Sequence, residues 1–349
     1  MAAADLSLPR SKWRSRFAAF AAVTVLAIAL AMTASLALGA VPIPARDVWA
    51  IALDRVWPGW IAPYWTAGRE AIVWDLRAPR TLLAAIVGAG LGLVGAALQS
   101  SIRNPLADPH LLGVSAGAAF GANLAILHFG DAFGPVTTPL FAFMGALFTT
   151  FCVLGAARIA GAGTADRLVL TGVAVAFVVT AAANMLILFA DQRAAANVVF
   201  WTLGGFGAAD WTTIALPALA LVGGLVWFGL KARDLNALAM GDETAATLGI
   251  AVDRARLAHM IVGALVAGVM VSVSGMIGFV GLMTPHMARL ILGGDNRLVL
   301  PASALLGSLF LVLADIASRT VIAPDDMPIG VVTGIVGGAF FVALLRRRN

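Results

Sequence analysis

The sequence has few charged residues, with only two lysines and one cysteine among 349 residues. Asp, Glu, Lys and Arg together make up 12% of the chain, whereas 61% is hydrophobic. Soluble domains are only about 45–50% apolar even when glycine is counted. A water-soluble protein of this size could not cover so large an apolar fraction with so few charges. The scarcity therefore excludes an ordinary soluble domain and predicts an all-α polytopic membrane protein.

Several kinds of reactive chemistry are also missing. The single Cys152 allows no internal disulfide. A Walker loop needs a Gly-Lys pair, but Lys12 follows Ser and Lys231 follows Leu, so the chain cannot hydrolyse ATP with its own P-loop. The four histidines lack the spacing of metal ligands. We therefore expect no metal site and no catalytic residue.

One catalytic motif does match in letters, because Gly113-Val-Ser115-Ala-Gly117 fits G-x-S-x-G. A nucleophile elbow needs a strand, a turn and a helix, whereas this segment opens an expected membrane helix. An intramembrane serine protease with His286 as its base is one alternative. Small residues at this spacing are also typical of helix packing, and we favour that interpretation.

Long uncharged runs predict ten membrane spans. The run from 17 to 45 exceeds the apolar region of a signal peptide. The run from 257 to 288 is too long for one helix at about 1.5 Å per residue, and Ser274-Gly275 offers a break. The expected spans are 17–39, 81–102, 111–128, 138–157, 168–190, 211–230, 257–276, 279–293, 298–316 and 328–345.

The distribution of basic residues gives an independent test of this topology. With both termini in the cytoplasm, most of the 23 Lys and Arg residues fall in cytoplasmic segments, as the positive-inside rule requires. The net charge of +5 then needs no nucleic-acid partner. The basic residues assigned to the cytoplasm are Arg10, Lys12, Arg14, Arg16, Arg103, Arg158, Arg167, Lys231, Arg233, Arg254, Arg256, Arg289, Arg297 and 346–348.

Ion-coupled transporters usually keep an acidic residue near the middle of the membrane. Here Asp315 comes closest, and Arg319 follows at i+4, which predicts a helix-end ion pair. This pattern counts against a secondary transporter, which stays as an alternative. The uncharged segment 194–209 is too short to cross, and we expect a re-entrant or half-buried helix, with an interfacial helix as the alternative. Three small-xxx-small patterns predict close helix packing, and they are Gly88xxxGly92, Gly117xxxGly121 and Gly334xxxGly338.

The longest polar cytoplasmic stretch is 231–256, "KARDLNALAMGDETAATLGIAVDRAR". We expect Asp242 to cap a short helix through Leu248, with Gly249 in the position after its end. A short helix in such a loop is where a membrane protein would take force from a soluble partner. A solvated amphipathic linker fits the loop chemistry equally well.

Four segments taken together carry a family resemblance. They are "GAALQSSIRNPLADPHLLGVSAGAAFGA", the loop just described, "GMIGFVGLMTPHMARLILGGDNRLVLPASALLG" and "LADIASRTVIAPDDMPIGVVTGIVGGAFFVALLRRR". In this order they closely resemble the permease subunits of the ABC importers for ferric siderophores, haem and cobalamin (FecCD-like, type II importers). The resemblance covers roughly residues 70–348.

The resemblance implies more than the residues do by themselves. It implies ten transmembrane helices with an inverted repeat of helices 2–5 and 7–10, and a homodimer with the path on its two-fold axis. Two ATP-binding cassette subunits would bind on the cytoplasmic side, and a periplasmic or lipid-anchored substrate-binding protein would dock on the opposite side. ATP would be used by the partner, and no cofactor by this chain. The membrane would be the bacterial inner membrane.

By resemblance, residues 1–349 form one transmembrane permease domain. It would have a cytoplasmic tail at 1–16, a periplasmic loop at 40–78 and a cytoplasmic coupling loop at 231–256. The cargo would be an iron complex, either a ferric siderophore or haem, with cobalamin as the alternative. Polar residues that could touch cargo are Asn184, Gln192 and Arg193.

The family's Asn-Pro-Leu-Ala segment lies at the cytoplasmic end of the path. By matching motif, Asn104 and Leu106 become gate residues, since proline fixes a short turn on which Asn and Leu offer a polar and an apolar plug. A capped structural turn is the alternative for Asn104. The partner gate precedes helix five, where Ala165 and Asp166 depart from the family's frequent small polar pair.

The remaining site residues also follow from the resemblance. The arginines would meet carboxylates of a binding protein, and a head-group anchor is the alternative for Arg80. The residues matching the family's coupling segment are Met240, Gly241, Asp242, Glu243, Leu248, Gly249 and Ile250. The residues matching its docking arginines are Arg77, Arg80 and Arg319.

Overall fold

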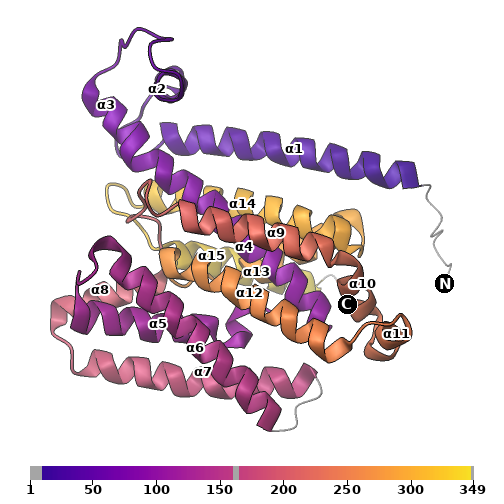
Figure 1. The fold of residues 1–349 in the computed structure, drawn as a ribbon. Coiled ribbons are helices and arrows are strands. Elements are labelled where there is room, and N and C mark those ends of the chain that lie inside the picture. Colours follow the sequence, from indigo (N-terminus) through magenta and orange to yellow (C-terminus); the bar gives the residue numbers. More distant parts are fainter. Residues whose placement is uncertain (1–9, 160–164, 347–349) are drawn as a thin grey trace.

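The computed structural model describes residues 10–159 and 165–346, and within these ranges the chain forms helices and no strand (Figure 1). The elements are α1 (Arg10–Ala37), α2 (Ala45–Val56), α3 (Ala67–Ala71), η1 (Ile72–Arg77), α4 (Ala78–Ile102), η2 (Pro109–Leu112), α5 (Val114–Leu124), η3 (Ala125–Phe129), η4 (Gly134–Val136), α6 (Thr137–Ile159), α7 (Ala165–Leu188), α8 (Gln192–Leu203), α9 (Ala215–Leu230), α10 (Ala232–Met240), α11 (Asp242–Thr247), α12 (Val252–Ser274), α13 (Val280–Leu292), α14 (Asn296–Thr320) and α15 (Ile329–Arg346).

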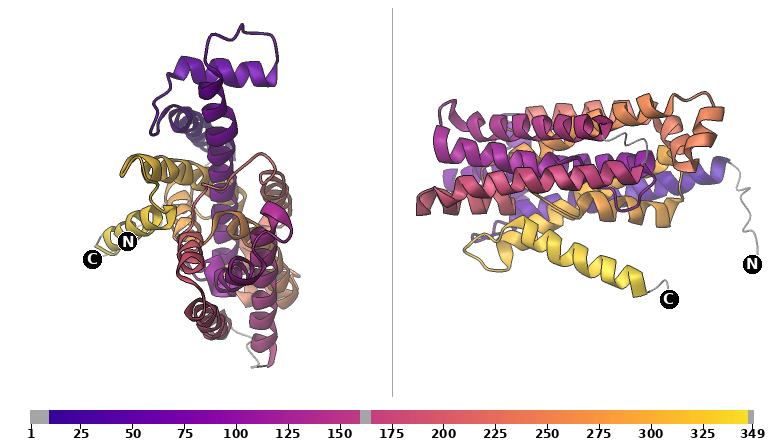
Figure 2. Two further views of the ribbon diagram at one scale, coloured as in Figure 1. Left: turned by 90° about the vertical axis from the view of Figure 1, so that its left-hand side faces the viewer. Right: turned by 90° about the horizontal axis from the view of Figure 1, so that it is seen from below.

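Each of the ten expected spans coincides with a helix, so the all-α prediction is confirmed. In the described residues, six helices are long and apolar enough to cross a membrane, or seven if α9 and α10, bent by 60°, form one span. The α5–η3 helix and α15 are shorter. The count of ten, the inverted repeat and the cytoplasmic placement of the ends stay predictions. Helix α1 begins and α15 ends at the same end of the bundle (Figures 1 and 2).

Helix α4 lies at the centre of the bundle (Figure 1). It contacts α9, α12, α13 and α14, and 94% of its most apolar window is buried, against 11% for α1 and for α7. Leu83, Leu93 and Leu98 are among its fully buried side chains. A helix that is apolar on every side is stable only when surrounded by other helices or lipid, which is the environment that α4 has here.

Glycines allow α4 and α14 to touch along their backbones. A Cβ at Gly88 would collide with the carbonyl oxygen of Gly307, and one at Gly117 with that of Gly145 in α6. Two of the three predicted small-xxx-small patterns therefore make close helix contacts, as expected. Around Gly334 and Gly338 an added Cβ would meet no described atom within 4 Å, so the third pattern makes no such contact within the described residues.

Replacing Gly88 with Ala is expected to destabilise the protein by about 1–3 kcal/mol, because the new methyl group must push two helix backbones apart. A lower midpoint of thermal unfolding in detergent would measure this loss. Gly338→Ala is the matched control and should leave the midpoint unchanged or slightly higher, because its methyl group meets no described atom and alanine favours a helix more than glycine does. Equal midpoints for both variants would contradict the close contact between α4 and α14.

The helix that contains α4 begins earlier than the sequence predicts. We expected residues 40–78 to form a loop, but a continuous helical run already begins at Ala67. Charged residues hid this run, and the fold pairs two of them: Arg69 with Asp47 at 2.8 Å and Glu70 with Arg55 at 2.8 Å. Helices α2 and α3 project from the end of the bundle opposite α10 and α11 (Figures 1 and 2).

The short helix expected in segment 194–209 is α8, which ends at Leu203 and has Val198 as its one buried residue, so its depth in the membrane stays a prediction. Asp191 accepts hydrogen bonds from the backbone N–H of residues 193 and 194, and Val198 is buried while Phe200 is 65% exposed. The chain then runs against the break between α12 and α13, which begins at Gly275 as predicted. There the Gly205 N–H donates to the Ser274 carbonyl at 2.8 Å.

Candidate functional site

The turn that follows α4, residues 103–108, is called here the gate turn. The side-chain oxygen of Asn104 accepts a hydrogen bond from the Leu106 N–H at 2.9 Å, and the backbone carbonyl of Asn104 accepts one from the Ala107 N–H at 3.0 Å. With Pro105 between these bonds, the backbone is held as a short turn. The geometry matches the capped-turn alternative for Asn104. Leu106 is 60% exposed, and the gating roles of both residues stay predictions.

The coupling segment, residues 240–250, lies next to the gate turn. The expectation that Asp242 caps α11 is wrong, because Gly241, with φ of +126°, is the N-cap residue and no side chain caps the helix. The Asp242 carboxylate instead accepts a hydrogen bond from the Arg256 guanidinium at 2.7 Å and lies 3.4 Å from the Arg103 guanidinium. The ionised carboxylate gains more from two nearby cationic guanidinium groups than from the neutral backbone N–H groups at the start of α11. Gly249, with φ of +82°, follows the helix as predicted.

Asp242 thus links the coupling segment to the start of α12 and to the gate turn, which is distant from both in sequence. Arg103 is the first residue of the gate turn and has a left-handed backbone, with φ of +56°. The Arg256 side chain is 9% exposed at the start of α12. Asp253 also faces Arg256, but only at 3.9 Å and with 94% exposure. The carboxylate of Asp242 is therefore the principal ionic contact between the coupling segment and the gate turn.

The coupling segment has one buried face and one exposed face. Ala245 is buried against Leu238, and Ile250 packs partly buried on the same cluster. Met240 and Leu248 are 70% and 64% exposed. Glu243 is also exposed, so the segment presents two apolar side chains and one carboxylate outward.

The second expected gate segment, the loop before α7, falls at the edge of the described structure. Residues 163 and 164 lie outside the described residues. Ala165 is the first residue of α7, but the side chains of Ala165 and Asp166 lie outside what the structure describes. Their gating role stays a prediction.

The three expected docking arginines lie at the opposite end of the bundle. Contact with a binding protein requires exposed guanidinium groups, but Arg77 and Arg319 are each only 8% exposed. Arg77 donates to the carbonyls of Leu36 at 2.8 Å and Val41 at 2.7 Å, so it closes the loop after α1. These guanidinium groups are occupied within the chain, and their contact with a binding protein stays a prediction.

Asp315 organises the other two arginines. Its carboxylate is fully buried and lies 3.0 Å from Arg319, which confirms the predicted i,i+4 pair. Arg80 donates to its other oxygen at 2.8 Å and also pairs with the half-exposed Asp326. These pairs account for Arg80 without a lipid head group. Because two guanidinium groups compensate Asp315, it is not a free acid of the kind that ion coupling requires.

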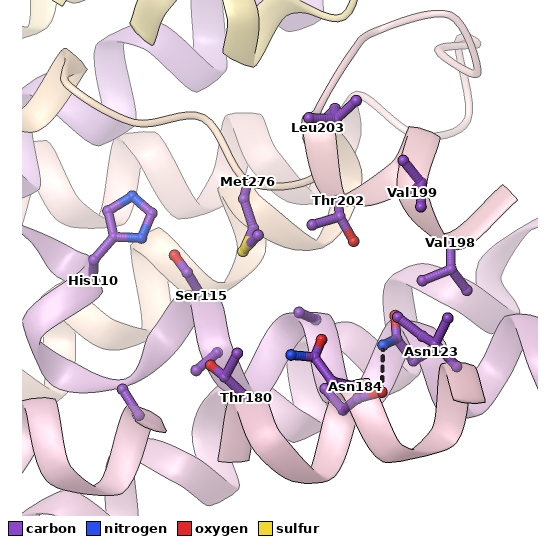
Figure 3. Close-up of a pocket in the computed structure, with 15 residues that line it drawn as sticks. His110, Ser115, Asn123, Thr180, Asn184, Val198, Val199, Thr202, Leu203 and Met276 are labelled. Atoms are coloured by element: carbon purple, nitrogen blue, oxygen red, sulfur yellow. Dashed lines mark hydrogen bonds between the residues drawn. The ribbon is translucent and has the colours of Figure 1, made fainter. Parts of the chain in front are cut away.

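Two cavities lie on either side of the end of α8. The first, called the Arg80 cavity, has a volume of about 530 Å³ and is lined by Arg80, Trp201, Gly204, Gly275 and Asp326 among others. The second, called the Asn123 pocket, has a volume of about 430 Å³ and lies between α5, α7, α8 and the α12–α13 break (Figure 3). The same two segments line both cavities with different residues: Thr202, Leu203 and Met276 line the Asn123 pocket, and Trp201, Gly204, Ser274 and Gly275 line the Arg80 cavity.

The Asn123 pocket also tests the protease alternative. Ser115 lines it, but among the described residues its hydroxyl has no hydrogen-bond partner. A serine nucleophile needs a base within hydrogen-bonding distance. His286, the base that sequence reasoning offered, does not line this pocket. The protease alternative therefore gains no support. In the described part of the chain, no three His, Cys, Asp or Glu side chains are grouped to hold a metal ion.

The model of the FecCD transport family matches residues 26–347. The chain belongs to the FecCD transport family. The hemin transport system permease protein HmuU of Yersinia pestis is 34% identical over 322 residues, covering 89% of this chain and 90% of that protein. The iron(3+)-hydroxamate import system permease protein FhuB of Bacillus subtilis is 36% identical, covering 97% and 86%. The vitamin B12 import system permease protein BtuC of Vibrio cholerae is 37% identical, covering 83% and 88%.

A solved structure agrees with these relatives. An inward-facing metal-chelate type ABC transporter matches with a TM-score of 0.78 and 25% identity, covering 93% of this chain and 97% of that one. Members of the family are multi-pass permease subunits of ABC transporters and are not themselves enzymes. The resemblance carried by the sequence motifs is confirmed.

Proposed function

We propose that this chain is the permease subunit of an ATP-driven importer that carries an iron complex, a ferric siderophore or haem, across the bacterial inner membrane. The match of the family model to residues 26–347 carries this proposal. The relatives named for hemin and for iron(3+)-hydroxamate support an iron complex as cargo. A cobalamin importer is the second candidate, favoured by the relative named for vitamin B12.

In this proposal the chain contributes a path and no reactive chemistry. Two copies surround the path, and two ATP-binding cassette subunits contact the coupling segments. The exposed Met240, Glu243 and Leu248 support this contact, because apolar side chains around a charge are typical of a docking surface. ATP is bound and hydrolysed by those partners, and this chain binds no cofactor. A substrate-binding protein delivers cargo at the end of the bundle that holds Arg80, opposite the coupling segment.

The geometry also supports a route from ATP to the gate. A displacement of the coupling segment moves Asp242, which forms an exposed ion pair at 3.4 Å with Arg103 at the start of the gate turn. The turn is stiffened by Pro105 and two internal hydrogen bonds, so it moves as a unit. Leu106 then enters or leaves the path.

The experiment is uptake in a deletion strain with and without this gene. Haem, ferric siderophores and cobalamin are supplied, each with the wild-type gene and with Glu243→Arg. Reversing an exposed charge inside a docking surface should lower uptake at least about tenfold, because like charges placed together cost several kcal/mol. The control is Asp253→Asn, which removes an exposed charge on α12 without placing a second cation beside Arg256, and it should keep most of the uptake.

The outcomes separate the candidates. Gene-dependent uptake of an iron complex, lost in Glu243→Arg, supports the proposal, and uptake of cobalamin alone favours the second candidate. Uptake that survives ATP depletion and collapses with the proton gradient would overturn the ATP-driven mechanism in favour of a secondary transporter.

A further inference from the structure

Helix α2 and the turn after it leave an apolar face exposed. Trp49, Leu53 and Val56 recur at the i, i+4 and i+7 spacing of one helix face, and Trp57 and Trp60 extend this face beyond the end of the helix. Trp60 is 78% exposed and Trp49 is 53% exposed. Contiguous exposed apolar surface marks a site that binds a protein or a membrane. These five residues are called here the α2 platform.

The opposite face of α2 is buried, so the platform is held in a fixed orientation. Val48, Ala50 and Ile51 belong to a hydrophobic cluster, and the last turn of α1, at Leu36 and Ala37, packs against that cluster. The two ion pairs described above also join α2 to α3. Helix α2 is therefore fixed to the end of α1, and its apolar face has one direction relative to the bundle.

Helix α1 shows at which depth in the membrane α2 lies. The apolar stretch Ser15–Ala37 is long enough to cross a bilayer, and only 11% of its most apolar window is buried, so side chains such as Leu26 and Leu30 face lipid. Because α2 packs against the last turn of α1, it lies where this span ends. Figure 1 shows α2 nearly end-on, and the left view of Figure 2 shows it from the side. Helix α2 therefore runs across the direction of α1 and along the membrane surface.

The segment that carries the platform has no net charge. Residues 45–70 contain three arginines and three carboxylates, and two of the arginines pair with two of the carboxylates. The third arginine, Arg46, lies over the Tyr64 ring at 4.8 Å. A partner that docks through charged groups would find no excess charge here. Exposed tryptophan rings are instead typical of the region where a bilayer meets water.

We propose that the α2 platform anchors the permease in the membrane leaflet opposite the coupling segment, with its rings among the lipid head groups and the upper acyl chains. The platform continues the lipid-facing surface of α1, so its occupant is the membrane in which the chain already lies. An amphipathic helix in this plane binds through the apolar area that it buries. The helical run from Ala67 joins the platform to α4, so the anchor holds the end of α4 that carries Arg80. This inference goes beyond the proposed function and holds for any cargo.

The test measures how deep the platform lies in a bilayer. The full-length permease is reconstituted in phosphatidylcholine vesicles, and a nitroxide label is attached at Val56→Cys in a Cys152→Ser background, which keeps every platform tryptophan. Collisions of the label with oxygen, which dissolves in the bilayer, and with a nickel chelate, which stays in water, give its depth. We expect the label to lie about 5–10 Å below the lipid phosphates. The control is Gly68→Cys, an exposed position on α3 with open space around it, whose label should lie above the phosphates.

A second variant tests whether the tryptophan rings supply the anchor. Trp49, Trp57 and Trp60 are replaced together by Gln, and the label at residue 56 should then move above the phosphates. All three side chains are exposed, so the midpoint of thermal unfolding in detergent should match that of the wild type. Adding phosphatidylglycerol to the vesicles should leave the depth of the unsubstituted platform unchanged, because the segment has no net charge.

The other occupants of the platform would give different signals. A label at residue 56 that is as accessible to the nickel chelate as the label at residue 68 overturns the anchor. A label shielded from both oxygen and the nickel chelate overturns it in favour of a protein contact. Magnetic broadening between labels would identify that protein as a second copy, and shielding only after the substrate-binding subunit is added would identify it as that subunit. A depth that does not change in the Gln variant shows that the rings are not the anchor and overturns the proposal. Uptake is not measured, so a failure of the importer proposal leaves this test unaffected.

Discussion

Asp242→Asn is expected to lower substrate uptake at least about tenfold while the complex still hydrolyses ATP. The carboxylate is bonded to Arg256 at 2.7 Å and lies 3.4 Å from Arg103 of the gate turn. An amide keeps the shape of the side chain but loses the charge that holds both guanidinium groups, and hydrogen bonds between charged groups contribute about twice as much as neutral ones. Motion of the coupling segment would then no longer reach the gate turn.

The measurement compares uptake and ATP hydrolysis by the same reconstituted complex. Asp253→Asn is the matched control, because Asp253 faces the same Arg256 at 3.9 Å but is 94% exposed, and surface pairs contribute little. Arg103→Ala, which removes the other partner of the Arg103–Asp242 ion pair, should lower uptake in the same way. Parallel losses of uptake and hydrolysis in Asp242→Asn would show that the bridge supports assembly and not transmission.

Asp315→Asn is expected to destabilise the permease by about 3–5 kcal/mol, because it leaves buried Arg80 and Arg319 without their shared carboxylate. Asp315 has no exposed surface, and the two guanidinium groups lie within 3.0 Å of it. The protein should purify in lower yield and unfold at a lower temperature. This would be the largest stability effect expected from any single substitution considered for this chain.

Asp326→Asn provides the comparison, since Asp326 pairs with the same Arg80 but is 49% exposed. Its loss should cost at most about 1 kcal/mol. Unfolding temperatures are measured for both variants in the same detergent. An Asp315→Asn protein as stable as the wild type would mean that Arg80 and Arg319 reach water or other partners in the membrane.

The sequence was most informative about helices and their breaks. Uncharged runs predict helices because a bilayer selects apolar segments along the whole length of a crossing, and each expected run coincides with a helix. The break at Gly275 was also predictable, since a left-handed backbone, here with φ of +68°, favours glycine. The boundary at Ala67 was missed because charges in that helix are neutralised by residues earlier in the chain.

Long-range partners were beyond sequence reasoning. Asp242 looked like a helix cap because capping is a local rule, whereas its real partners include Arg103, far away in sequence. The burial of Arg77 and Arg319 was not predictable, because the backbone carbonyls that they bind, in the segment 35–41, carry no sequence signal. The Asn123 pocket needs side chains from several helices and became visible only when these were assembled.

The contact between residues 201–205 and the α12–α13 break has a consequence for the two cavities. The Gly205 N–H bonds directly to the Ser274 carbonyl, and a Cβ on Gly275 would collide with the Trp201 carbonyl oxygen. This backbone seam separates the two cavities, with the Arg80 cavity on one side and the Asn123 pocket on the other. A shift of this seam toward one cavity would therefore narrow that cavity and widen the other.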